Sequence, residues 1–187
     1  DIGAVEVQPP APPLPLVTTT ADSGPGSLRD AVNAAAPTGS VISFDPDLAG
    51  QTITLTSGRI ILAKNLIIDA GTLGITLSGN HSSSLFQIES GRVVTLRGLA
   101  LVNGDKPVGG GGGLFNSGSL TLEHCGISGN SADDGGGGIL NYGSLVMTDC
   151  TVSGNSAYEG GGIHNFGTIT MTDCRIFDNT AGLWGGG

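Results

Sequence analysis

The sequence predicts an all-β fold, a parallel β-solenoid whose coils take about 25 residues each. Three observations support this prediction. The second half of the chain repeats one motif, since GGGGGLFNSGSLTLEHCGISGNSA is followed by GGGGILNYGSLVMTDCTVSGNSA and GGGIHNFGTITMTDCRIFDNTA. Short apolar runs alternate with polar residues inside each unit, and glycine or asparagine separates these runs. Self-similarity at such a period is the signature of a solenoid.

The alternation within each repeat is typical of strands. A period of two places apolar side chains on one side of a strand and threonine or acidic side chains on the other. Glycine clusters would melt a helix, whereas turns accept them. Successive coils should lie about 4.8 Å apart, so that equivalent residues form ladders. The inward set is Leu120, Leu122, Cys125 and Ile127, then Leu145, Met147, Cys150 and Val152, then Ile169, Met171, Cys174 and Ile176.

The repeats also support a resemblance to a known family. The [GGG][ILV]xN and [IV]xxN pairs resemble the GGAI and FxxN repeats of polymorphic outer-membrane proteins, with Ile or Val in place of Phe. They resemble still more closely the bacterial right-handed parallel β-helix repeat proteins, over residues 16–187. The stretch VTTTADSGPGSLRDAVNAAA is similar to the N-terminal cap of that family. The resemblance implies a right-handed β-helix and an adhesin-like protein that is extracellular or at the cell surface.

The chain should have three parts. Residues 1–7 (DIGAVEV) form a strand-like segment, residues 8–16 a stiff proline-rich linker, and residues 17–187 the β-helix with its cap. In the family just named, a DIGAxE segment closes the C-terminal end of a β-helix, but here it stands first. It would therefore either end an upstream unit of a tandem array or cap an open coil of another copy.

A short amphipathic helix is expected over about residues 27–36. Ser27 and Asp30 form a capping-box-like opening, with Leu28, Ala31, Val32 and Ala35 on one face, and Pro37 and Gly39 end the helix. The helix would cover the first coil and hide its unpaired edge. Residues 41–55 and 60–69 supply the first strands, with core candidates Ile42, Phe44, Ile53, Leu55, Ile61, Leu66 and Ile68.

The coils upstream of the glycine-rich repeats should follow the same register. Leu96, Leu99 and Leu101 are expected to align with Leu122, Cys125 and Ile127. Further back, Ile75, Leu77 and Asn80 are expected to align with Cys125, Ile127 and Asn130. The cysteine column then continues as leucine and isoleucine, which places the cysteines in the apolar interior. We expect free buried thiols; one strained disulfide or metal chemistry is the alternative.

The sequence breaks off within a coil, and this suggests a hypothesis about assembly. Residues 1–7 of one copy would complete the open C-terminal coil of the next and build a head-to-tail filament. The assembly residues would be Asp1, Ile2, Gly3, Ala4, Val5, Glu6, Val7, Trp184, Gly185, Gly186 and Gly187. The expected partners are other copies of the chain or tandem β-helix units, with surface glycans as a further candidate.

Two asparagine ladders should serve structure and not chemistry. Stacked side-chain amides can hydrogen-bond from coil to coil, and asparagine tolerates left-handed turns. The two ladders are Asn116, Asn141 and Asn165, and Asn130, Asn155 and Asn179.

Several acidic residues are weak candidates for a Ca²⁺ site. Asp149 and Asp173 should stack on the outside with His124 below them, and a bound cation would relieve their repulsion. Asp133, Asp134 and Glu159 precede the glycine runs on adjacent loops. Solvated turn acids are the simpler interpretation, so we expect no catalytic residue, no metal site and no cofactor, with Ca²⁺ as the alternative.

The remaining side chains offer weaker signals. Tyr142 and Phe166 should stack at one corner, which suits either corner packing or a carbohydrate platform. An outward threonine row, Thr95, Thr121 and Thr170, is interrupted by Val146, which disfavours ice binding. The three histidines form no visible site.

Composition excludes some partners. The net charge is −9 and charged residues are 12% of the chain, so no basic patch exists for nucleic acid. No apolar run is long enough to span a membrane as a helix. The resemblance and the assembly hypothesis together imply a non-enzymatic extracellular structural β-solenoid, an adhesin or a filament subunit. The alternatives are a β-helix polysaccharide lyase or glycoside hydrolase, and a carbohydrate- or ice-binding module.

Overall fold

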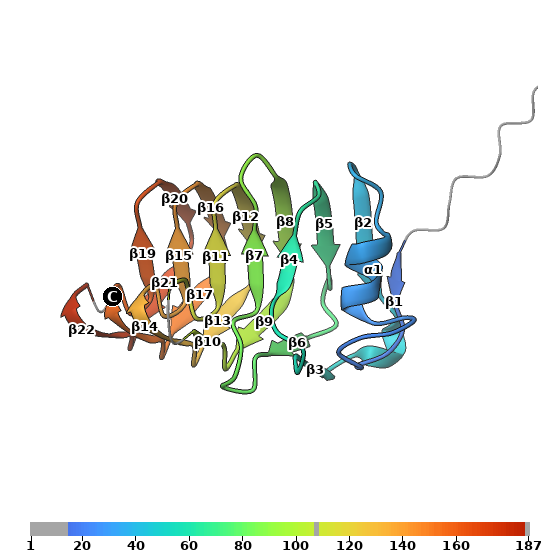
Figure 1. Cartoon of the computed structure of the whole chain (residues 1–187), viewed down its shortest axis with the longest axis horizontal. Helices are drawn as coiled ribbons and strands as arrows, with labels where there is room; N and C mark the ends of the chain where they lie inside the picture. The colour runs from blue at the N-terminus through green and yellow to red at the C-terminus, as the bar shows by residue number, and fades with distance from the viewer. Residues whose placement is uncertain (1–14, 107–108, 186–187) are drawn as a thin grey trace, which may run out of the picture.

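A computed structural model describes residues 15–106 and 109–185 of the 187-residue chain. The chain winds into a parallel β-solenoid with α1 at one end and β22 (Thr180–Trp184) at the other (Figure 1). Every strand pair within these ranges is parallel, as a coil stack requires. The predicted fold class is therefore confirmed.

The described strands form four sheets that run along the solenoid. The seven-stranded sheet contains β1 (Leu16–Val17), β2 (Ser40–Phe44), β5 (Leu66–Asp69), β8 (Val93–Arg97), β12 (Ser119–Glu123), β16 (Ser144–Thr148) and β20 (Thr168–Thr172). The six-stranded sheet contains β3 (Thr52–Thr54), β6 (Ile75–Ser78), β9 (Leu99–Val102), β13 (Gly126–Ser128), β17 (Thr151–Ser153) and β21 (Arg175–Phe177).

Two shorter sheets complete the coils. The five-stranded sheet contains β4 (Ile60–Leu62), β7 (Phe86–Ile88), β11 (Leu114–Asn116), β15 (Ile139–Asn141) and β19 (Ile163–Asn165). The four-stranded sheet contains β10 (Asp105–Lys106), β14 (Ser131–Gly135), β18 (Ser156–Glu159) and β22. From β11 onward each coil passes through all four sheets in turn. The expected repeat unit is thus one coil.

The sequence alignment of the coils agrees with the strand register. Leu96 pairs with Leu122, and Leu101 pairs with Ile127. Leu99 pairs with Ile75 in the preceding coil, at the position that Cys125 occupies in the next. The outward row of Thr95, Thr121, Val146 and Thr170 is also in register.

The N-terminal cap consists of α1 (Leu28–Ala34) and the 3₁₀ helix η1 (Pro46–Leu48). Ser27 caps α1 by accepting a hydrogen bond from the Asp30 amide at 3.2 Å, as predicted. Leu28, Ala31 and Val32 enter the core. The Lys64 ammonium closes the other end of the helix, because it donates to the Asn33 and Ala35 carbonyls at 2.6 and 2.7 Å.

The core is a continuous column of Leu, Ile and Val. One residue that was predicted to belong to this core lies outside it. Ile61 is 49% exposed, whereas Ile60 and Leu62 on either side of it are buried. The three apolar residues form one short strand, so the middle side chain must point away from the core. The sequence alone does not say which of the two alternations faces inward.

The residues with left-handed backbone are neighbours of the ladder asparagines, and the ladder asparagines themselves do not have this conformation. Asn103 and Asp178 have φ of 52° and 54°, and Gly129 and Gly154 take the equivalent position with φ of 63° and 61°. The ladder asparagines have no positive φ, so their role is hydrogen bonding alone. Asn80, which the sequence aligns with Asn130, is exposed and has φ of 52°, so it does not share the buried setting of that residue.

Residues 1–7, and residues 8–14 of the proposed linker, lie outside the described residues. The linker prediction extended to residue 16, but Leu16 belongs to β1, which pairs with β2. In the part of the chain that the structure describes, no helix is long and apolar enough to cross a membrane.

Candidate functional site

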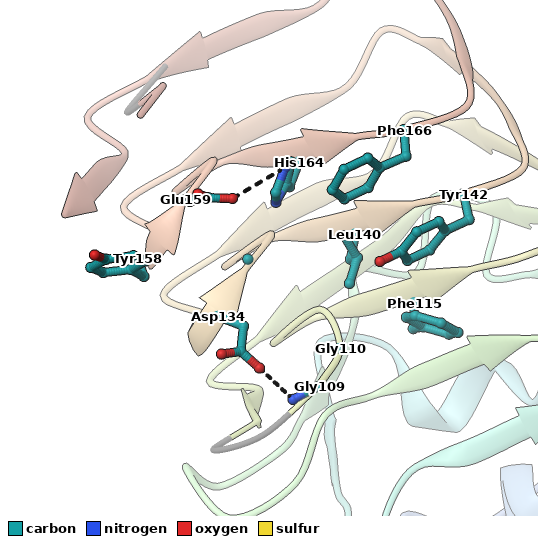
Figure 2. A pocket seen from close by; sticks show the side chains of 11 residues that line it. Gly109, Gly110, Phe115, Asp134, Leu140, Tyr142, Tyr158, Glu159, His164 and Phe166 are labelled. Atoms are coloured by element: carbon teal, nitrogen blue, oxygen red, sulfur yellow. Dashed lines mark hydrogen bonds and ion pairs between the residues drawn. The ribbon is translucent and has the colours of Figure 1, made fainter. Parts of the chain in front are cut away.

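A groove of about 580 Å³ lies where the five-stranded and four-stranded sheets meet (Figure 2). Its walls come from three consecutive coils, because β11, β14, β15, β18 and β19 all contribute. The volume is within the range of small-molecule and cofactor pockets. The lining residues are Gly109, Gly110, Phe115, Asp134, Gly135, Leu140, Tyr142, Tyr158, Glu159, His164 and Phe166.

One wall of the groove is an aromatic column. The Tyr142 and Phe166 rings stack with centroids 4.9 Å apart and planes 9° apart, because they occupy equivalent positions one coil apart. Phe115 continues the column at 5.8 Å from Tyr142 in a tilted arrangement. Tyr142 is 53% exposed and Phe166 is 58% exposed. The predicted corner stack is therefore confirmed, and it faces a groove.

The facing wall carries two carboxylates and a second tyrosine. Asp134 lies on β14, and Glu159 and Tyr158 end β18 (Figure 2). Asp134 is exposed, and its Oδ2 accepts a hydrogen bond from the Gly109 amide at 2.8 Å. The sequence predicted these acids on loops, but the structure places them on β14 and β18. The pairing of these two strands contains a register shift. Asp133, the neighbour of Asp134, does not line the groove.

His164 connects the two walls. It lies next to Phe166, with ring centroids 4.3 Å apart, and its Nε2 is 3.7 Å from Glu159 Oε2. Its Nδ1 is buried and has no hydrogen-bond partner among the described residues. The ring fits only because Gly135 has no side chain, since a Cβ at that position would overlap Nδ1. The glycine therefore creates room for the imidazole.

The groove carries more acidic than basic side chains. None of the described lining residues is a lysine or an arginine, and His164 is the only basic side chain there. Lys106 packs beside Gly110, since a Cβ at Gly110 would lie 3.6 Å from Lys106 Cγ, but Lys106 lines a different pocket with Ser82, Ser83 and Asp105. Two carboxylates in such surroundings favour a positively charged or hydrogen-bond-donating ligand.

The asparagine ladders hold the coils together, as predicted. The Asn116 amide donates to Asn141 Oδ1 at 2.7 Å, and the Asn141 amide donates to Asn165 Oδ1 at 2.6 Å. The other ladder repeats the pattern, with Asn130, Asn155 and Asn179 linked at 2.9 Å per step. Because each side chain also binds a backbone carbonyl, these residues are fully engaged in structure.

The cysteines are free thiols that point inward. Cys125 and Cys150 are buried at 2% and 1% exposure, and Cys174 packs partly buried against the core. A hydrogen bond with Cys150, together with burial, raises the pKa of the Cys125 thiol. The predicted inward position is thus confirmed.

The outer acidic ladder occupies turn positions. His124, Asp149 and Asp173 have φ between 51° and 54°, and His124 Nε2 lies 3.5 Å from Asp149 Oδ2. Aspartate and asparagine tolerate this left-handed conformation better than most residues do. Across residues 15–106 and 109–185, no three His, Cys, Asp or Glu side chains gather closely enough to hold a metal ion.

The sequence did not indicate the groove, although one signal in it could have. Phe115, Leu140 and His164 occupy equivalent positions in successive coils, yet they are three different residue types. Positions that keep one residue type build the solenoid, whereas positions that change between repeats are free for function. Of the three histidines, His164 lines the groove, whereas His81 and His124 do not.

The assembly residues are only partly described. Trp184 and Gly185 end the last described coil, whereas Gly186, Gly187 and residues 1–7 lie outside the described residues. Filament formation through these residues stays a prediction.

Comparison with known proteins agrees with this architecture. Residues 53–186 match a family model described as the right-handed β-helix region. Comparison with curated proteins and with solved structures gives no match. Because the matched region covers most of the chain and the described strands form a parallel solenoid, this chain belongs to the right-handed β-helix family.

Proposed function

We propose that this chain is a non-enzymatic, extracellular, adhesin-like β-solenoid that binds carbohydrate in the groove between its five-stranded and four-stranded sheets. The observation that carries the proposal is the pairing of an exposed aromatic column with two carboxylates across one concave surface. Large aromatic side chains exposed together, and rimmed by polar groups, mark binding surfaces.

The chemistry of the two walls suits a sugar. A pyranose has an apolar face of C–H groups, which packs against an aromatic ring, and a rim of hydroxyl groups, which donate hydrogen bonds to carboxylates. Phe166 and Tyr142 supply the first kind of contact, and Asp134 and Glu159 supply the second. The groove crosses three coils, about 10 Å by strand spacing, so it has room for a short segment of a glycan chain.

A rigid scaffold favours such a role. The aromatic column is attached to a backbone that hydrogen-bonds to the coils above and below, and the Asn141 ladder lies one residue away from Tyr142. Binding would therefore require little ordering of the protein, which reduces its entropic cost. A repeat solenoid also presents the groove on a long surface, as extended binding proteins do.

The second candidate is a glycoside hydrolase, because two carboxylates in one groove are the residues that such enzymes use. We rank it second. Asp134 is exposed, and the Glu159 side chain is 39% exposed. The general acid of a hydrolase commonly lies in a more apolar setting. A polysaccharide lyase is less favoured still, since it needs cationic side chains for its acidic substrate and none of the described lining residues is a lysine or an arginine.

The test is a binding and turnover assay with a panel of oligosaccharides. We expect saturable binding to at least one glycan, and a loss of about tenfold or more in Tyr142→Ala and Phe166→Ala. Phe177→Ala is the matched control, because Phe177 is an exposed aromatic residue, 45% accessible, that lies on β21 away from the groove. Absence of binding to every glycan would overturn the proposal. Release of reducing ends that is lost in Asp134→Asn or Glu159→Gln would establish the hydrolase instead.

A further inference from the structure

We infer that the groove selects glycans with free amino groups, that is, glucosamine-type chains in which the sugar carries an ammonium ion. This inference rests on the proposed carbohydrate binding and specifies its ligand class. It follows from the combination of two carboxylates, four aromatic rings and no Lys or Arg side chain among the described lining residues.

The two carboxylates are available to an incoming cation. Asp134 uses Oδ2 for the Gly109 amide, so Oδ1 keeps its lone pairs for a ligand. Glu159 lies 3.7 Å from His164 Nε2, which is longer than a hydrogen bond, so its oxygens are not committed. An ammonium group has three donors and no acceptor, so it can donate a charge-assisted hydrogen bond to either carboxylate. A neutral hydroxyl group would gain less, because charge-assisted hydrogen bonds are about twice as strong as neutral ones.

The aromatic side chains favour the same ligand. The faces of tyrosine and phenylalanine rings attract cations electrostatically. Tyr158 stands on the carboxylate side of the groove at 52% exposure, and Phe166 stands on the opposite side at 58%. A sugar ammonium held by Asp134 or Glu159 would therefore meet an aromatic ring as well as a carboxylate.

Anionic sugars are disfavoured by the same features. A uronate would bring a negative charge to a groove that already holds two, on a chain of net charge −9. His164 is the single basic side chain among the described lining residues, and the two carboxylates outnumber it. Neither the walls nor the overall field of the protein would compensate the uronate charge.

The test compares three oligosaccharides of equal length by calorimetry: glucosamine, N-acetylglucosamine and galacturonate oligomers. The assays use mildly acidic buffer, where the amines are protonated. We expect the glucosamine oligomer to bind at least tenfold more tightly than the N-acetylated one, and the galacturonate oligomer not to bind. Raising the salt from roughly 0.05 to 0.5 M should weaken the first interaction several-fold, because salt screens charge pairs.

Variants locate the effect. Asp134→Asn and Glu159→Gln should each lose most of the preference for glucosamine over N-acetylglucosamine. Asp133→Asn should keep it, because this control removes the same charge one residue away, outside the groove. Thermal unfolding of each variant confirms that the fold is retained.

The outcomes separate this inference from the proposed function. Equal binding of glucosamine and N-acetylglucosamine oligomers would overturn the charge preference and leave carbohydrate binding intact. Binding of choline alone, as tightly as the glucosamine oligomer, would show a cation site without sugar recognition and overturn both. Absence of binding to all three oligomers and to choline would also overturn both. Loss of the preference in Asp133→Asn as well would place the effect outside the groove and overturn the assignment of its site.

Discussion

The Arg29 guanidinium donates a hydrogen bond to the Asp22 carboxylate at 2.7 Å, and this contact fastens the N-terminal cap to the solenoid. Asp22 also accepts hydrogen bonds from the Ser57 amide and hydroxyl, and from the Thr56 hydroxyl. Arg29 in turn donates to the Gly58 and Arg59 carbonyls ahead of β4. One ion pair thus links α1, the loop before it and the second coil.

The Asp22 carboxylate should make stability depend on pH. Desolvation by burial opposes its ionisation, but the hydrogen bonds from Arg29 and Ser57 outweigh that effect and lower the pKa of Asp22 to about 2. The pKa in the unfolded chain is near 3.8, so the contribution is complete above about pH 4 and is lost as the pH falls toward 2. Asp22→Asn should therefore lose about 1–2 kcal/mol at pH 7 and little at pH 2.

Denaturant unfolding of the wild type and of Asp22→Asn at several pH values checks this. Asp47→Asn serves as the control, because Asp47 is an exposed residue whose side chain makes no ion pair among the described contacts. A difference between Asp22→Asn and the wild type that stays constant from pH 7 to pH 2 would contradict the assignment.

The Asn141 side chain should be worth more than a single hydrogen bond. It is fully buried, it accepts from the Asn116 amide, and its own amide donates to the Asn165 side chain and to the Gly143 and Thr168 carbonyls. Asn141→Ala leaves several of these partners unsatisfied inside the solenoid. We expect a loss of about 2–4 kcal/mol in the free energy of unfolding.

The measurement is the urea midpoint of Asn141→Ala beside that of Asn33→Ala, since Asn33 is exposed on α1 and should tolerate the change. Equal midpoints for the two variants would mean that the ladder contributes nothing.

The sequence revealed the fold because the repeat places the same residue type in the same environment in every coil. Cys125 and Cys150, for example, could be assigned to the interior from their alignment with Leu99, which the register confirms. Single positions without a repeat were harder to place. Ile61 belongs to a run of three apolar residues, and either of two alternations would have fitted the pattern.

The groove was not predictable for a different reason. Asp134 and Glu159 recur at the 25-residue spacing and could be placed on adjacent loops, but no spacing in the sequence sets them opposite the aromatic column of Tyr142 and Phe166. Only the meeting of two sheets at a corner does so. The room for His164 also depends on the missing side chain of Gly135, and such a close approach has no signature among so many glycines.

The buried cysteines should resist alkylation while the protein is folded. Cys125 and Cys150 are almost completely buried, and the hydrogen bond with Cys150, together with burial, raises the pKa of Cys125. Because burial shields both thiols from the reagent, iodoacetamide at neutral pH should modify neither residue in the folded protein. Cys174, which is only partly buried, should react first.

Mass spectrometry of the alkylated peptides, with and without denaturant, measures the order in which the three thiols react. Equal labelling of all three thiols in the native state would contradict the ladder geometry.

The fit of His164 against Gly135 gives the sharpest test of the groove. A methyl group at Gly135 would overlap His164 Nδ1, so Gly135→Ala must displace the imidazole from its position between Glu159 and Phe166. We expect weaker glycan binding by several-fold and a loss of about 1–3 kcal/mol from overpacking. The position of the His164 ring can be followed by its NMR chemical shifts.

Gly126→Ala is the matched control, because a Cβ at Gly126 meets no other atom within 4 Å, and both its binding and its stability should stay near the wild-type values. If Gly135→Ala binds glycans as the wild type does while its His164 signals move, the imidazole has no part in the site.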